Sequence, residues 1–204
     1  MPTITQNPIG HGRIVWLGVN QKRGEFSIPR NTLRIHEDGV EDDMYRGMWR
    51  KIAGHDVDYI ATDGVAKGDQ VLNLRQLTII EEGEVTQAGV LAGTTIERGM
   101  LRENMAVRFT HQVGRQKFSG LPPLSRMVIN HGEKNTKVLL LTEENGPCRT
   151  ICQPMSVHFG GGPELADKLR DHLGRNRGQM AMVRSGKSED VRVGDPFLIF
   201  PPMV

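Results

Sequence analysis

The sequence has 204 residues, of which 37% are hydrophobic and 25% are charged, and its formal net charge at pH 7 is +2. This length and composition fit one globular domain over residues 1–204, and the small, dispersed charge argues against a nucleic-acid partner. No apolar run approaches the ~20 residues that span a bilayer. The opening segment MPTITQNPIGHGR lacks the basic and apolar regions of a signal peptide, so we expect a cytoplasmic protein without membrane contact.

Short β-forming segments separated by turn residues dominate the chain. The 24 glycines and 11 prolines are spread along its length, which is typical of an all-β barrel or sandwich rather than of a helical bundle. The segment LRENMAVRF places Met105, Val107 and Phe109 at a period of two, as in a half-buried strand. In chain order, strands are predicted at 12–20, 67–80, 101–109, 125–130, 136–144, 179–186 and 196–200.

Two segments favour helices. Residues 81–93 form one candidate, which two internal glycines weaken. Residues 163–174 begin with proline, end with glycine and carry a leucine stripe at i, i+4 and i+8, so they form the other. The segment 41–66 has the least regular pattern and is interpreted either as a long loop over a site or as a helix-loop excursion.

Both cysteines of the chain lie in TEENGPCRTICQPM. Cys148 directly follows the turn-forming residues 145–147, which would hold it rigidly, and Arg149 adds a positive charge that favours a thiolate. In an extended chain, Cys152 would lie about 13 Å away at ~3.3 Å per residue, too far for a disulfide, which needs ~4.4–6.8 Å. Cys148 is therefore interpreted either as a buried structural thiol or as a thiol presented to bind something. Cys148, Cys152 and His158 together would provide only three metal ligands, at wider spacing than a structural zinc site usually has, so structural zinc is not expected.

The cysteine segment and its surroundings resemble the MOSC domain, the C-terminal module of molybdenum cofactor sulfurases that also occurs as free-standing bacterial proteins. NGPC follows a hydrophobic strand and precedes a helix and RNRGQMAMVRSGKSEDVRVGDPFLIF, as in that family. Further segments agree in order along nearly the whole chain: GRIVWLGVN, EDGVEDD, RQLTIIEEGE, GMLRENMAV, LPPLSRMVIN and VGDPFLIF. The resemblance implies a mainly β fold, a pyruvate-kinase-type barrel with a few peripheral helices.

The sequence departs from the family pattern in one region. Asp42 stands where the family's turn usually has glycine, and 44–66 contains no H-G-G element. This departure indicates a divergent, free-standing branch, and it puts in doubt the substrate contacts that the family makes there.

The resemblance also implies a ligand, the molybdenum cofactor, which is a pterin dithiolene with a phosphate. Such a ligand needs a thiolate for the metal, donors for the pterin edge and guanidinium groups for the phosphate. Cys148 is then the metal-binding or sulfur-carrying, catalytic residue. Asn104 is the candidate for the pterin edge, with capping of a turn as its alternative role, and Asn145 either contacts the cofactor or shapes its turn. The candidates for the phosphate are Arg75, Arg102 and Arg149.

Three functions remain open at this point. The first is an enzyme that reduces N-hydroxylated compounds, with electrons from a partner reductase. The second is a carrier that holds sulfur or cofactor on Cys148 for delivery to another enzyme, such as a molybdoenzyme. The third is a ligand-free barrel that serves in interactions. A chain of 204 residues leaves no room for a PLP-dependent desulfurase domain, so the sulfur would come from another protein.

Overall fold

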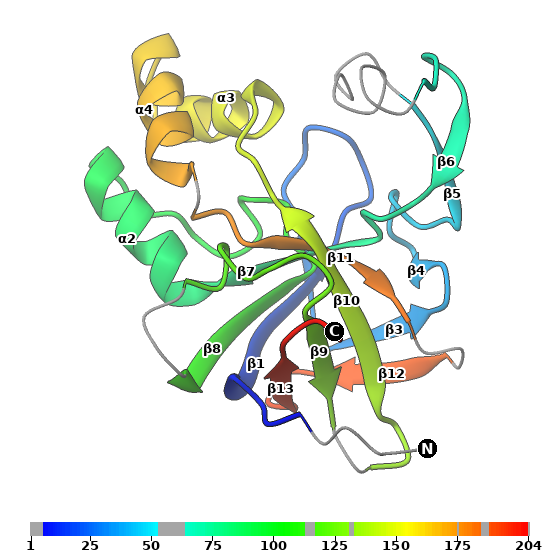
Figure 1. Ribbon diagram of the computed structural model, residues 1–204. Helices are drawn as coiled ribbons and strands as arrows, with labels where there is room; N and C mark the ends of the chain where they lie inside the picture. The colour runs from blue at the N-terminus through cyan, green and yellow to red at the C-terminus, as the bar shows by residue number, and fades with distance from the viewer. Residues whose placement is uncertain are drawn as a thin grey trace.

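A closed barrel forms the body of the molecule (Figure 1). The computed structural model describes residues 6–52, 64–112, 117–130, 133–174, 176–184 and 188–203. Seven strands follow one another around the barrel in the order β13-β9-β10-β11-β7-β8-β1, and pairing of β1 with β13 closes it. The pair β7 and β8 is parallel, and the other barrel pairs are antiparallel. The mainly β fold with a few peripheral helices that the sequence predicts is confirmed.

The barrel strands match the predicted segments with one substantial correction. The segment 67–80, predicted as one strand, forms two that are separated at residues 73–76. The break has a local cause, because the amide of Asn73 donates hydrogen bonds to the carbonyl oxygens of Tyr45 and Gly47 and turns the chain there. The barrel strands are β1 (Gly10–Val19), β7 (Leu77–Glu81), β8 (Met105–Gln112), β9 (Arg126–Ile129), β10 (Lys137–Glu144), β11 (Gln179–Val183) and β13 (Pro196–Phe200).

Smaller strands surround the barrel. One of them extends the sheet beyond β1, three form a separate sheet in the order β12-β3-β4, and two form a hairpin that stands beside one end of the barrel. The predicted strand 67–80 supplies the second arm of this hairpin. The peripheral strands are β2 (Ile28–Arg30), β3 (Thr32–His36), β4 (Gly39–Val40), β5 (Trp49–Lys51), β6 (Gln70–Leu72) and β12 (Glu189–Arg192). Of the irregular segment 41–66, residues 53–63 lie outside the described residues.

Alternating side chains fill the barrel. Along β10, Leu139 and Leu141 are fully buried while Leu140 between them is partly exposed, as the period of two in a strand requires. The interior cluster takes side chains from every barrel strand, including Ile79, Met105 and Phe197. Because this interior is packed with apolar groups, a polar ligand must bind at the outside or at an end of the barrel.

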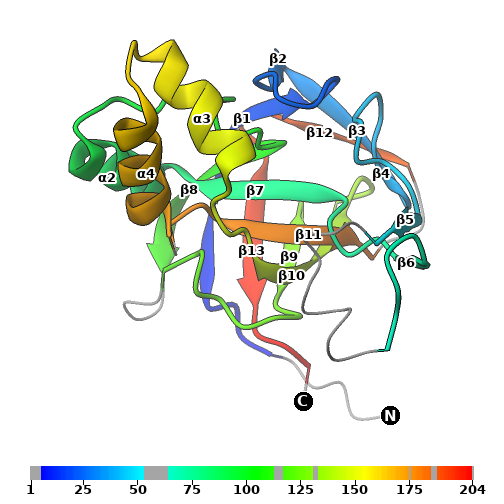
Figure 2. The same cartoon turned by 90° about the horizontal axis from the view of Figure 1, so that it is seen from above.

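Three helices form a layer beside the barrel (Figure 2). The helix α2 (Glu82–Ala92) connects the parallel strands β7 and β8, and α4 (Pro163–Leu173) packs between α2 and α3. Both were predicted, and Pro163 takes the first turn of α4 as expected. A second apolar cluster, which includes Leu101, Met155 and Leu169, joins the layer to the barrel. In the described part of the chain, no helix has the length and hydrophobicity needed to span a membrane.

The helix α3 (Arg149–His158) corrects the sequence analysis. An extended chain from Cys148 to Cys152 was assumed, but these residues form the first turn of this helix, and the nitrogen of Cys152 donates to the carbonyl oxygen of Cys148 over 3.1 Å. The expected separation of about 13 Å is therefore wrong, since i and i+4 are neighbours on a helix. The two thiols lie one turn apart at the beginning of α3.

Candidate functional site

Cys148 is the N-cap of α3 and is exposed, whereas Cys152 is buried in the apolar cluster under the helix. The backbone angles of Cys148, φ −136° and ψ 163°, are extended, so Cys148 lies where the turn ends and the helix begins. Burial raises the pKa of the Cys152 thiol to about 11. Of the two open interpretations of Cys148, a buried structural thiol is wrong and an accessible thiol agrees with the structure. Cys152 is the core residue.

The turn before Cys148 is fixed to the strand next to it. The nitrogen of Asn145 donates to the carbonyl oxygen of Gly178 over 3.0 Å. Gly178 has a φ of +85°, and a Cβ there would lie 2.0 Å from the carbonyl oxygen of Ile79. Glycine is therefore the residue that allows β11 to begin so close to β7, and this approach places the residue before it, Arg177, under the turn.

Arg177 provides a buried positive charge at the site. Arg177 is only 6% exposed, and its guanidinium donates hydrogen bonds to the carbonyl oxygens of Gly146 and Leu101. None of the described carboxylates forms an ion pair with it, and its Nε has no hydrogen-bond partner. Burial lowers the pKa of this guanidinium, and the negative forms of Cys148, Cys152 and Glu103 act in the opposite direction. A buried cation without an anion is costly, so an anionic group is expected beside it.

Arg102 is a second buried arginine, on a segment that Arg177 contacts. It follows Leu101, whose carbonyl oxygen Arg177 contacts, and it is 5% exposed. Its Nη2 donates to the carbonyl oxygen of Lys22 over 3.2 Å, and its guanidinium lies 5.6 Å from the centre of the Tyr45 ring. Its Nε has no partner within the described ranges. A φ of +60° strains an arginine by ~1–2 kcal/mol, which indicates that the position of this side chain is imposed by its surroundings.

Asn145 adds an amide with unused hydrogen-bonding capacity. The residue is fully buried, and neither its Oδ1 nor its Nδ2 has a partner among the residues that the structure describes. Leaving a buried donor or acceptor unsatisfied costs ~1–3 kcal/mol. Asn145 belongs to the turn that precedes Cys148 and lies three residues before it. The expected turn is present, and the side-chain amide is buried with its hydrogen-bonding capacity unused.

Glu103 completes the polar cluster around Arg177. It is fully buried, its carboxylate accepts a hydrogen bond from the nitrogen of Gly99, and its Oε2 has no partner in the described structure. Burial raises its pKa to about 7, while hydrogen bonds from Gly99 and other backbone groups, and the charge of Arg177, act against that rise. Near neutral pH this carboxyl therefore gives only partial compensation for the charge of Arg177.

Asn104 is held by hydrogen bonds within the protein. Its Oδ1 accepts from the nitrogen of Thr78 over 3.0 Å, and its Nδ2 donates to Oδ2 of Asp43 over 2.6 Å and to the carbonyl oxygen of Gly18 over 3.3 Å. These bonds agree with the alternative, structural role, and contact with a pterin edge stays a prediction. Asp43 also accepts from the backbone nitrogens of Asn20 and Tyr45, so it anchors the segment that positions the Tyr45 ring.

The turn that departs from the family pattern keeps the geometry that glycine would provide. Asp42 has a φ of +61°, in the left-handed region where glycine is favoured and aspartate is tolerated. The substitution is therefore compatible with the turn that presents Asp43.

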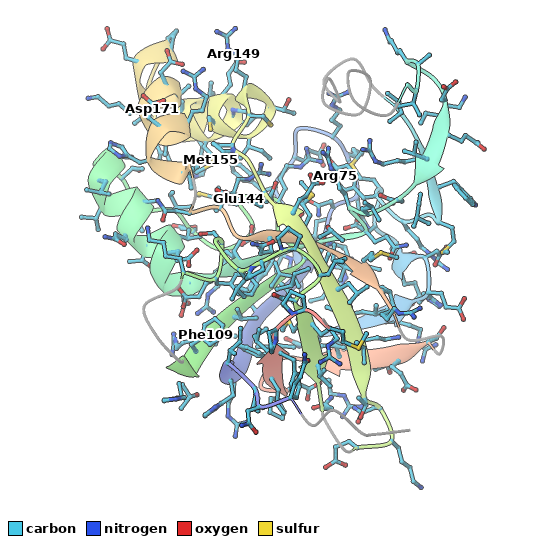
Figure 3. The ribbon with its side chains drawn as sticks, in the orientation of Figure 1. Arg75, Phe109, Glu144, Arg149, Met155 and Asp171 are labelled. Carbon is cyan, nitrogen blue, oxygen red and sulfur yellow. The ribbon has the colours of Figure 1, made fainter. Side chains whose placement is uncertain are left out.

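The predicted arginines do not converge. Arg75 forms a partly buried ion pair with Glu143, and Arg149 is exposed at the first position of α3. Figure 3 shows Arg149 beside the helices and Arg75 on the other side of the end of β10, toward the hairpin. Asn145 lies three residues before Cys148. Arg102 contacts Lys22, Met44 and Tyr45, so its role at the site stays a prediction. Arg177 was not singled out from the sequence, and the available signal was a charged residue directly before a glycine and a buried strand.

The fold is a MOSC-like barrel, and the site places an exposed cysteine beside a buried arginine. The structure is similar to YuaD from Bacillus subtilis, with a TM-score of 0.79 and 20% sequence identity over 95% of this chain and 97% of that chain. It is also similar to YiiM from Geobacillus stearothermophilus, with a TM-score of 0.54 and 10% identity over 92% of this chain and 74% of that chain. These likenesses support the MOSC-like fold. The sequence itself matches no family model and no curated protein.

Proposed function

We propose that the protein binds a molybdenum–pterin cofactor, with Cys148 as the ligand of the metal or the carrier of its sulfur. One observation carries this proposal: an exposed cysteine stands beside Arg177, a buried guanidinium that has no ion pair with any described carboxylate. The MOSC-like fold, and the resemblance of NGPC and the segments around it to that family, point to the same class of ligand.

The residues at the site fit the chemistry of such a ligand. A thiolate suits a soft transition metal, and guanidinium groups suit a phosphate. Cys148 would supply the first, and Arg102 with Arg177 would supply the second. The unpartnered amide of Asn145 offers both a donor and an acceptor, which matches the edge of a pterin ring. When bound, the cofactor would supply two-electron redox chemistry, which the side chains of this chain do not provide by themselves.

The site contains no cluster of metal ligands that would favour a different ion. Across the described ranges, no group of three or more His, Cys, Asp and Glu side chains has the spacing to hold a metal. A metal at Cys148 would therefore take its other ligands from a cofactor, as the pterin dithiolene would provide. Asn104, Arg75 and Arg149 stay secondary candidates, because the first two use their side chains in internal contacts and the third is exposed.

We assign the reaction to the reduction of N-hydroxylated compounds, with electrons from a partner reductase. In this enzyme function, Cys148 would hold the metal, and the two buried arginines would hold the anionic groups of the cofactor. The exclusion of water from Arg102 and Arg177 strengthens their electrostatic interaction with a bound anion.

The exposure of Cys148 also favours a second function, transfer of sulfur. The beginning of a helix stabilises negative charge, and Cys148 is the N-cap of α3. Its thiolate would attack the outer sulfur of a donor persulfide, R–S–SH, forming Cys148–S–SH and releasing R–S⁻. The persulfide would then be delivered to a molybdoenzyme or to its cofactor.

Metal analysis tests the proposal. Protein purified from a host that makes the cofactor is expected to contain molybdenum, and Cys148→Ser is expected to lose it. Cys152→Ala, a variant of the buried neighbour, is the control and should retain most of the metal. Absence of molybdenum from the wild type, or equal loss from both variants, would contradict a single-cysteine metal site.

A second measurement separates the two functions. The molybdenum-loaded protein is assayed for reduction of an N-hydroxylated purine with a chemical electron donor. Turnover that requires Cys148 supports the enzyme. A persulfide on Cys148, detected by mass spectrometry after treatment with a persulfide donor and without turnover, supports the carrier.

A further inference from the structure

A groove runs along the outer side of α3 and begins next to Cys148. Its walls are α3, from Arg149 to His158, and residues 24–26 in the loop that joins β1 to β2. Its volume is about 680 Å³, within the ~300–1,000 Å³ of typical small-molecule sites. The groove does not include Arg102 or Arg177, so it is adjacent to the polar cluster and separate from it.

The groove is mainly apolar along its length. Phe26, Pro154 and Val157 line it, and Val157 is 69% exposed although it belongs to a helix with a well-packed opposite side. The ring of His158 meets the ring of Phe26 edge-on, with centroids 5.5 Å apart, and together they hold one end of the groove in a defined shape. A ligand with an aromatic or alkyl body would remove this apolar surface from water.

The charged side chains of the groove favour an anion at the end next to Cys148. Arg149 lies at that end, and no described carboxylate forms an ion pair with it. The acidic residue of the groove, Glu25, pairs with Lys22 over 3.5 Å. Among the described residues Arg149 thus has no carboxylate partner, and it lies at the beginning of a helix, where an anionic group is stabilised.

We propose that this groove binds the body of a small aryl or alkyl carboxylate, whose anionic head lies beside Arg149. Binding of such a molecule depends only on the groove, and it goes beyond the function proposed for Cys148. The apolar walls would select for a hydrophobic body, and Arg149 would select for a negative head over a neutral one.

The test uses 2-naphthoate and its neutral analogue 2-naphthamide, titrated calorimetrically into the metal-free protein. We expect saturable 1:1 binding of 2-naphthoate. Val157→Asp places a carboxylate in the apolar wall and should weaken that binding at least about tenfold. Val90→Asp is the matched control, because Val90 is a 73% exposed valine on α2 outside the groove, and it should bind as the wild type does.

A second variant tests the role of charge. Arg149→Gln should weaken binding of 2-naphthoate and leave binding of 2-naphthamide unchanged. Absence of saturable binding to the wild type, equal binding by Val157→Asp and Val90→Asp, or equal loss of both ligands in Arg149→Gln would overturn the proposal. Far-ultraviolet circular dichroism of each variant verifies that the fold is kept.

The outcome is separable from that of the metal analysis. If naphthoate binding responds to Val157→Asp in a protein that takes up no molybdenum, the proposed ligand of the groove is supported and the proposed cofactor is contradicted. If the protein takes up molybdenum but does not bind naphthoate, the proposed cofactor is supported and the proposed ligand of the groove is contradicted.

Discussion

Arg177 donates a hydrogen bond to the carbonyl oxygen of Gly146, two residues before Cys148. This bond ties a buried cation to the turn that presents the accessible thiol. The same guanidinium also contacts the carbonyl oxygen of Leu101, so it joins the turn to the segment that carries Arg102 and Glu103. The cysteine, the two arginines and the buried carboxyl therefore form one unit, held by the chain segments on which they lie.

Removal of Arg177 should abolish binding of a simple oxyanion. We expect inorganic phosphate to raise the melting temperature of the metal-free protein in a saturable way, by an amount that follows RT ln(1 + [L]/Kd). Arg177→Met should lose this response, since it keeps an apolar side chain of similar length and removes the charge. Arg75→Met is the control, because Arg75 is partly exposed and paired with Glu143. An equal phosphate response in Arg177→Met would remove Arg177 from the site.

Glu103 should make the protein less stable as the pH rises from about 4.5 to 7. Its pKa is about 7 in the folded protein, against an ordinary value of 4.5, so the folded state holds the proton more tightly than the unfolded state. Its favourable contribution is complete below about pH 4.5 and is lost as the pH rises toward 7, with a total change of about 3 kcal/mol.

Urea denaturation at pH 5 and pH 8 measures this effect. The free energy of unfolding of the wild type should be lower at pH 8 than at pH 5. That of Glu103→Gln should differ less between the two pH values. Glu97→Gln provides the control, since Glu97 has no such burial. Identical pH profiles for Glu103→Gln and the wild type would show that this carboxyl titrates normally.

Gly178 should not tolerate a side chain. Gly178→Ala would combine a positive φ of +85° with a Cβ 2.0 Å from the carbonyl oxygen of Ile79, and we expect a loss of at least about 3 kcal/mol in the free energy of unfolding. Gly24→Ala is a matched control, because Gly24 has a φ of +87° and no atom within 4 Å of the added Cβ. It should cost only ~1–2 kcal/mol. A similar cost for both variants would mean that the close approach to β7 is relieved without difficulty.

The two cysteines should differ in their reaction with iodoacetamide. In the native protein at pH 8, Cys148 is accessible, whereas the buried thiol of Cys152 has a pKa of about 11 and remains protonated. Mass spectrometry should detect one adduct on the wild type and none on Cys148→Ser. After unfolding in urea, both residues should react, which verifies that the reagent is sufficient. A native adduct on Cys152 would contradict the packing of α3.

The sequence predicted the strands and two of the helices because burial on one side leaves a period in the chain. The spacing of apolar residues indicates which side of an element faces the interior, as for Leu139 and Leu141 in β10 and for the leucine stripe of α4. The helix α3 was not predicted, because Pro154 lies inside it and its first turn follows a turn-forming segment. Its buried residues, which include Ile151, Cys152 and Met155, nevertheless recur at helical spacing. Packing against α4 stabilises this helix, and local sequence does not encode that packing.

The site was predictable in part. The turn chemistry of residues 145–147 pointed to Cys148, which the structure shows to be exposed, and to Asn145 three residues before it. Arg177 was missed because its burial follows from the approach of β11 to β7, which brings together residues far apart in the sequence. Arg75 was expected at the site, but its partner Glu143 lies 68 positions away, and no local pattern indicates that pair.

Closure of the barrel by β1 and β13 has a consequence for the order of assembly during synthesis. Strand β1 leaves the ribosome among the earliest elements, but β13, one of its two barrel neighbours, emerges after all the others. Until then the nascent chain carries an open edge on β1, and β9 also lacks one of its partners. A stalled chain that lacks β13 would expose these edges to pairing with other chains, so newly made copies are most exposed to aggregation until β13 has emerged and paired.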